Sequence, residues 1–245
     1  MIEDSEIDNF ISLYEQRALK RNVGGLSAES SFWIWETLKE KTGIKHVIES
    51  GIWRGATTWL ISRTKPEMTI DCLDPLTGGF DSDLLVSSLE ALKVMLALGA
   101  KQEMIDEVTR DGGKWWAHDI QPPSVQKSRH DIMNFEPRKP RSGETLVILD
   151  DHQDILPRLK RCIELGVDHV IIDDNHPWVP SPHKGFYHYL KTVGVSVAEH
   201  DQFVEFQNKH IDFWYEFEHL KHGYFVPFER HQYLIYVKLK LAGVK

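Results

Sequence analysis

The feature that most constrains the fold is a pair of short apolar segments, each followed directly by two acidic residues. Residues 146–149 precede Asp150 and residues 169–172 precede Asp173, and a second aspartate follows each of these two. A helical pattern over residues 155–165 separates the segments. Continuously apolar strands that alternate with helices are typical of a parallel sheet covered on both faces. Both acidic pairs are therefore expected at the carboxyl edge of such a sheet.

The first half of the chain contains the same alternation of strand and helix. Residues 46–49 are apolar enough for a buried strand, and the turn at residues 50–55 is followed by a helical pattern over residues 56–63. Residues 69–74 then read as a second strand, which completes a βαβ unit. With a third strand expected within residues 125–131, the sequence predicts an α/β, Rossmann-like, doubly wound and mostly parallel sheet.

The remaining segments are assigned more coarsely, within one domain that comprises all 245 residues. We expect N-terminal helices within residues 1–43 and a helical lid inserted at residues 77–123. A C-terminal antiparallel hairpin is expected from residues 224–228 and 233–239. Further helices are predicted over residues 185–192 and 201–220.

Composition excludes several classes of protein. Hydrophobic residues make up 41% of the chain, which is too many for a disordered protein. The net charge of −8 argues against nucleic-acid binding, and no apolar stretch is long enough to span a membrane. The acidic start does not resemble a secretory signal, and Cys72 and Cys162 read as core residues rather than a disulfide. These features favour a cytoplasmic location, and they leave a homodimer open.

The first predicted strand ends in a glycine turn. Glu49, Gly51 and Gly55 form the pattern E-x-G-x-x-x-G, which differs from the dinucleotide-binding pattern G-x-G-x-x-G. Glycine allows a close backbone approach to a ligand, and a carboxylate there suits a cationic, hydroxyl-bearing ligand better than a pyrophosphate. A plain turn is the alternative. If the turn binds a ligand, Gly51→Val should abolish binding without unfolding the chain.

Residues 46–59, HVIESGIWRGATTW, resemble motif I of class I S-adenosylmethionine (SAM)-dependent methyltransferases. The resemblance implies that the strand-end acid and the glycines hold the methionine part of SAM. It also implies that Asp74 lies near the ribose and Asp131 near the adenine. The cofactor-binding residues implied are Glu49, Gly51, Trp53, Gly55, Thr57, Asp74, Asp131 and Asp150.

The two acidic pairs suggest a metal. Four converging carboxylates repel one another, and a hard cation such as Mg²⁺ or Ca²⁺ would relieve the repulsion. The alternative is that some of them cap helices, as Asp150 or Asp151 could. The segments also resemble the fourth and fifth strands of cation-dependent O-methyltransferases of the catechol and caffeoyl-CoA type. That resemblance implies Asp150 or Asp151 as one ligand, with Asp174 and Asn175 as the others.

The doubled acid Asp173-Asp174 is also similar to macrocin-type sugar O-methyltransferases and their cephalosporin-hydroxylase-like relatives, where these two residues would be the pair. The register of the metal ligands therefore stays open. The lysine base of catechol-type enzymes is absent, because its position holds Gln153 or Asp154. His152 beside Asp150 is the first candidate for the base, with His176 second, although a histidine next to acids is as often part of a surface ion pair.

These features predict a SAM-dependent O-methyltransferase that requires a divalent cation such as Mg²⁺. Its acceptor would be a hydroxylated small molecule or a sugar-containing metabolite. Two alternatives are a metal-dependent hydrolase or hydroxylase on the same fold, and a non-catalytic binding protein on a methyltransferase scaffold. The aromatic runs at residues 115–116 and 213–217 are read as core in preference to a substrate wall.

Overall fold

The structure is a computed structural model, and it describes part of the chain. The described residues are 5, 8, 12, 28–41, 43–51, 57, 61, 65, 67–73, 125–128, 131–136, 142–151, 153–173, 184–217 and 234–241. The predicted lid at residues 77–123 lies outside them.

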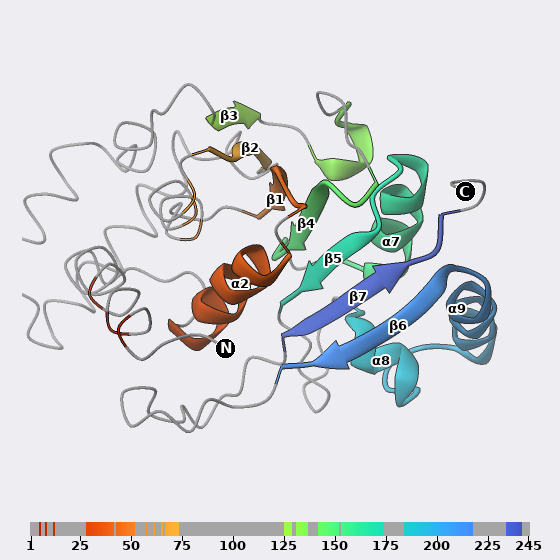
Figure 1. The fold of residues 1–245 in the computed structure, drawn as a ribbon. Coiled ribbons are helices and arrows are strands. Elements are labelled where there is room, and N and C mark those ends of the chain that lie inside the picture. The colour runs from red at the N-terminus through yellow and green to blue at the C-terminus, as the bar shows by residue number, and fades with distance from the viewer. Residues whose placement is uncertain are drawn as a thin grey trace, which may run out of the picture.

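A seven-stranded sheet forms the centre of the described structure, with the order β3-β2-β1-β4-β5-β7-β6 (Figure 1). Strands β1 to β5 pair in parallel, whereas β7 is antiparallel to both of its neighbours, β5 and β6. This confirms the predicted Rossmann-like, mostly parallel sheet. The strands are β1 (His46–Ser50), β2 (Thr69–Leu73), β3 (Val125–Ser128), β4 (Thr145–Leu149), β5 (His169–Ile172), β6 (Ile211–Glu216) and β7 (Ile235–Leu239).

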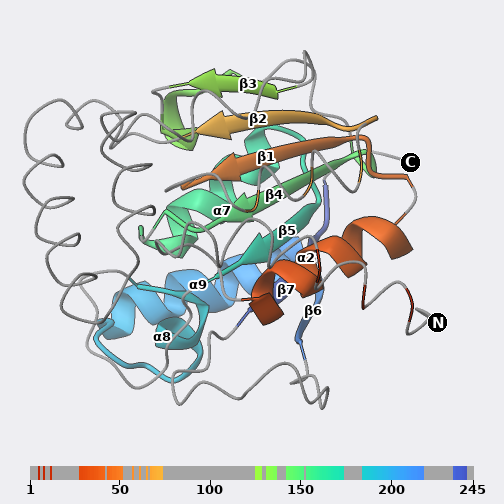
Figure 2. The same ribbon diagram turned by 90° about the vertical axis from the view of Figure 1, so that its left-hand side faces the viewer.

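Helices cover both faces of the sheet, as Figures 1 and 2 show. Helix α2 (Ala28–Glu40) lies on one face, where Ile34 and Leu38 join a core with Val47 of β1. The opposite face carries α7 (Ile155–Glu164), α8 (Phe186–Leu190) and α9 (Val197–His210). None of the described helices is both long and apolar enough to cross a lipid bilayer.

The strands at the centre of the sheet are buried on both faces, which explains their continuous apolar sequences. All five residues of β4 are buried, and Val147 packs toward the α7 side while Ile148 packs toward the α2 side. Cys72 and Cys162 are also buried, on opposite sides of the sheet. The prediction that the two cysteines are core residues is therefore confirmed.

The C-terminal part differs from the prediction. The helix expected over residues 201–220 ends at His210, and the next six residues form β6. Strand β7 pairs with β5 and β6, whereas residues 224–228, the predicted partner in the hairpin, lie outside the described residues. In β6 the aromatic residues alternate between faces: Trp214 packs against the core on the α8–α9 side, while Tyr215 stacks on Tyr236. Aromatic residues that alternate in this way suit a strand.

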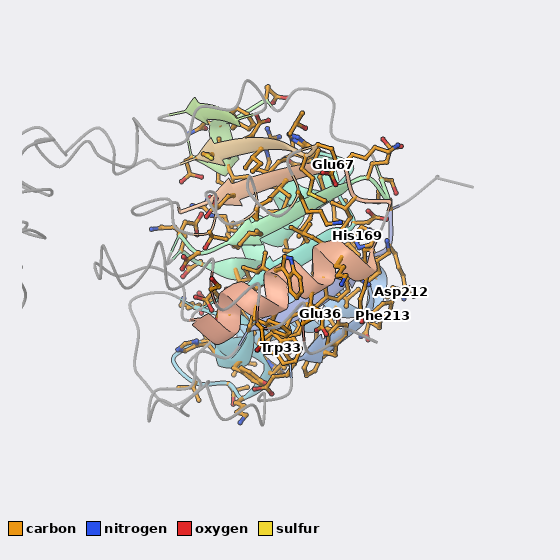
Figure 3. All side chains as sticks on the ribbon, turned by 60° about the vertical axis from the view of Figure 1, so that its left-hand side comes forward. Trp33, Glu36, Glu67, His169, Asp212 and Phe213 are labelled. Atoms are coloured by element: carbon orange, nitrogen blue, oxygen red, sulfur yellow. The ribbon has the colours of Figure 1, made fainter. Side chains whose placement is uncertain are left out.

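His169 lies at the amino edge of the sheet (Figure 3), within a partly buried network of charged and polar groups. The ammonium of Lys238 lies 3.1 Å from Nε2 of His169 and 2.6 Å from a carboxylate oxygen of Asp168. An ammonium can only donate, so Nε2 accepts, and Nδ1 then donates to the hydroxyl oxygen of Tyr236. Burial, with the nearby charges of Lys238 and Lys41, lowers the pKa of His169 to about 4.

Candidate functional site

The strand order places a topological switch point between β1 and β4. From β1 the sheet extends through β2 to β3 on one side, and through β4 to β5 on the other. In open α/β sheets, ligands bind in the crevice beyond the carboxyl ends of the strands at such a point. The turn after β1 and the acidic pair after β4 both lie there, so the structure brings together two features that the sequence presents 100 residues apart.

Hydrogen bonds hold these strand ends in register. The backbone N–H of Asp150 donates to the carbonyl of Ser50 at 2.8 Å, and the N–H of Gly51 donates to the carbonyl of Leu73 at 2.8 Å. The N–H of Asp173 donates to the carbonyl of Leu149 at 2.9 Å, which extends the same edge to β5. The first aspartate of each acidic pair therefore lies at the end of neighbouring strands, as predicted.

Gly51 is required by the backbone that surrounds it. Its φ is +87°, and a Cβ at this position would lie 2.1 Å from the carbonyl oxygen of Asp150. The sequence predicts a close approach between this glycine and a ligand. What the structure shows at Gly51 is a close approach to the backbone of Asp150 and Asp151, after β4.

Two other cofactor candidates in the first part of the chain are buried. Glu49 is 2% exposed, on β1 two residues before Gly51, and Thr57 is 4% exposed in a helical segment. A buried carboxylate close to the crevice favours a positively charged or hydroxyl-bearing group and disfavours a pyrophosphate. Which ligand Glu49 favours stays a prediction from the sequence.

Asp151 is part of a buried ion pair. Its Oδ2 accepts a hydrogen bond from the hydroxyl of Ser50 at 2.7 Å and lies 3.0 Å from Nε of Arg158. Burial raises the pKa of this carboxyl, although Arg158 and Ser50 act in the opposite direction. The sequence alone does not show that Asp151 has these partners.

Asp131 is the N-cap of the short 3-10 helix η3 (Ile132–Asn134). Its Oδ1 accepts from the backbone N–H of Met133, and its Oδ2 accepts from Nη2 of Arg158, both at 2.8 Å. The sequence reading did not single out Arg158. The sequence does contain a signal for a buried arginine. Arg158 lies three residues after Ile155 and four before Cys162, so it falls on the apolar face of α7.

Several predicted site residues lie outside the described part of the chain, and their roles remain predictions. These residues are Trp53, Gly55, Asp74, His152, Asp174, Asn175 and His176. Among the residues that the structure does describe, no group of three or more His, Cys, Asp or Glu could hold a metal ion.

Comparisons with known proteins give the fold a name. No model of a known protein family matches the sequence, and no curated protein does. Among solved structures, a SAM-dependent O-methyltransferase from Thermotoga maritima matches with a TM-score of 0.50 and 12% identity, over 95% of this chain and 72% of that one.

Two further solved structures match with lower TM-scores. A methyltransferase from Geobacter sulfurreducens has a TM-score of 0.47 at 13% identity, over 98% of this chain and 93% of that one. An SAH-bound methyltransferase from Podospora anserina has a TM-score of 0.47 at 11% identity, over 98% of this chain and 97% of that one. From the Thermotoga match and its own strand order, the chain has the fold of class I SAM-dependent methyltransferases.

Proposed function

We propose that this protein is a SAM-dependent O-methyltransferase that requires a divalent cation. The proposed acceptor is a hydroxylated small molecule or a sugar-containing metabolite. The observation that carries the proposal is the close approach of Gly51, two residues after the buried Glu49 of β1, to Asp150, which follows β4. This close approach occurs at the switch point, where folds of this kind bind their ligands.

The cofactor would lie across the end of β1. Glu49 offers a buried carboxylate to the ammonium or hydroxyl groups of SAM, and Thr57 is buried in the helical segment that follows. Asp131, after β3, is proposed for the adenine side, and its fixed position as the N-cap of η3 suits that role. This set of groups fits a cationic ligand with hydroxyl groups.

The cation would lie across the ends of β4 and β5. Asp150 and Asp173 end these neighbouring strands, and their carboxylates are the ligand type that Mg²⁺ prefers. We favour Asp150 over Asp151 because Asp150 directly follows β4, beside β5 and Asp173. Asp174 and Asn175 complete the proposed set. When bound, the cation would lower the pKa of the acceptor hydroxyl and orient it.

Binding of SAM is the first test. Calorimetric titration of the purified protein is expected to show a dissociation constant near 1 μM, about −8 kcal/mol. Glu49→Gln should weaken binding at least about tenfold, since a charge-assisted contact is lost. Glu67→Gln is the matched control, because Glu67 is 66% exposed and lies at the opposite edge of the sheet (Figure 3).

Transfer of a labelled methyl group to a panel of hydroxylated metabolites then tests the reaction. EDTA should abolish transfer, and added Mg²⁺ should restore it. Metal-dependent turnover without SAM would favour a hydrolase or hydroxylase instead. An absence of SAM binding, with or without Mg²⁺, would favour a non-catalytic protein on this fold.

A further inference from the structure

Arg158 is an arginine buried in the core side of α7. Its side chain is 6% exposed, and its helix neighbours Leu159 and Cys162 are fully buried. A guanidinium keeps its charge under all ordinary conditions, and a buried charge is tolerated only when it is paired. The acidic partners of Arg158 therefore identify the segments that this arginine holds in place.

The partners of Arg158 come from two separate segments. Nη2 donates to Oδ2 of Asp131, in the segment that follows β3, at 2.8 Å. Nε lies 3.0 Å from Oδ2 of Asp151, in the segment that follows β4, as an ion pair rather than a hydrogen bond. Strands β3 and β4 are not neighbours, because β2 and β1 lie between them in the sheet. One guanidinium thus joins the ends of two strands that do not pair with each other.

Each partner is itself held near a proposed ligand position. Asp131 caps η3 through Met133 N–H, and Asp131 is the proposed adenine-side acid. Asp151 accepts from the Ser50 hydroxyl and directly follows Asp150, the proposed cation ligand. A shift of either segment away from Arg158 would leave a buried charge without its partner, so the two segments are constrained to move together.

We propose that Arg158 is a positioning residue that couples the adenine side of the site to its cation side. This inference rests on the proposed function. A ligand that orders the segment after β3 would, through Arg158, also order the segment after β4. Thermodynamic linkage then requires that SAM and the cation each raise the affinity for the other.

Arg161, three residues further along α7, is the matched control. It donates to the carbonyl oxygens of Ile132 at 3.3 Å and Phe135 at 2.8 Å, and it pairs with Glu136. Among the described residues it contacts the segment after β3 and its own helix, but not the segment after β4. A variant of Arg161 therefore loosens one segment without removing a link between the two.

The test is calorimetric titration with SAM, with and without saturating Mg²⁺, on the full chain. In the wild type, Mg²⁺ should tighten SAM binding by a factor on the order of ten. In Arg158→Lys the charge remains, but a single ammonium cannot span both carboxylates, so the factor should fall below about two. In Arg161→Lys the wild-type factor should remain.

A second variant covers the case in which Arg158→Lys does not fold, as judged by circular dichroism. Arg158→Gln combined with Asp151→Asn removes one charge of each sign, and the remaining Asp131 is 25% exposed and still bonded to Met133. This variant should also lose the effect of Mg²⁺. The coupling role is overturned if Mg²⁺ still tightens SAM binding in either folded variant. It is also overturned if the wild type binds both ligands but Mg²⁺ does not tighten SAM binding. In both cases the proposed function itself stands. If the wild type binds no SAM, the proposed function is wrong, and the coupling role of Arg158 is wrong as well.

Discussion

Gly51 and Asp150 approach each other so closely that a Cβ at position 51 would lie 2.1 Å from the carbonyl oxygen of Asp150. The contact is with backbone, which cannot turn aside as a flexible side chain can. The positive φ of Gly51 adds a second reason against any other residue. This glycine therefore supports the fold as well as the proposed ligand crevice.

The first prediction concerns this contact. Gly51→Ala should destabilise the protein by about 2–4 kcal/mol, through the clash and the strained φ together. The expectation from sequence, that Gly51→Val leaves the fold intact, is revised accordingly. Urea denaturation measures the loss, and Gly194→Ala is the control, since a Cβ there meets nothing within 4 Å although its φ is also positive. Equal losses of stability in Gly51→Ala and Gly194→Ala would mean that the positive φ, and not the clash with Asp150, causes the destabilisation.

The second prediction concerns the stability supplied by Arg158. Arg158→Met leaves the carboxylates of Asp131 and Asp151 without their shared cation, and the free energy of unfolding should fall by about 3–5 kcal/mol. Arg161→Met should cost less, because its carboxylate partners Glu136 and Glu164 are 85% and 63% exposed. Chemical denaturation at neutral pH compares the two. A smaller loss for Arg158→Met than for Arg161→Met would contradict the assignment of Arg158 as a buried bridge.

The third prediction concerns pH. His169 has a folded pKa of about 4, below the unfolded value of about 6.5, so between these values the unfolded chain binds a proton that the folded chain does not. Stability from this residue is present above about pH 6.5 and is lost as the pH falls toward 4, by on the order of 1–3 kcal/mol.

Denaturation midpoints at several pH values check this prediction. His169→Asn keeps a neutral N–H near Tyr236 but cannot titrate, so its stability should depend less steeply on pH between 6.5 and 4 than that of the wild type. Parallel curves for the two proteins would show that His169 does not contribute to the pH dependence.

The fourth prediction concerns the cation. Asp150→Ala should reduce methyl transfer on the order of a hundredfold or more, with SAM affinity in the absence of cation changed little. Asp212→Ala serves as the control, because Asp212 is exposed and lies away from the carboxyl edge (Figure 3). If EDTA leaves the activity of the wild type unchanged, the cation is not needed, and His152 becomes the candidate for a base that acts without metal.

Local patterns in the sequence were sufficient to predict all five parallel strands, β1 to β5, the helices α2 and α7, and the acids that follow β4 and β5. Strands β1, β4 and β5 are short and almost wholly buried, so their apolar runs, glycine turn and flanking acids carry the signal directly. The carboxyl-edge location of Glu49, Asp150 and Asp173 follows from the parallel direction of the strands alone.

Tertiary structure decided the remaining features, because they depend on partners far away in the chain. Residues 211–216 continue a helical pattern in sequence, yet they form β6 because β7 offers a free edge and their aromatic side chains find partners on both faces. Asp151 and Asp131 look like other site acids until the fold brings Ser50, 101 residues away, to one of them and Arg158, 27 residues away, to the other. Sequence thus determined which acids end the strands, whereas packing determined which of them became tied to a buried arginine.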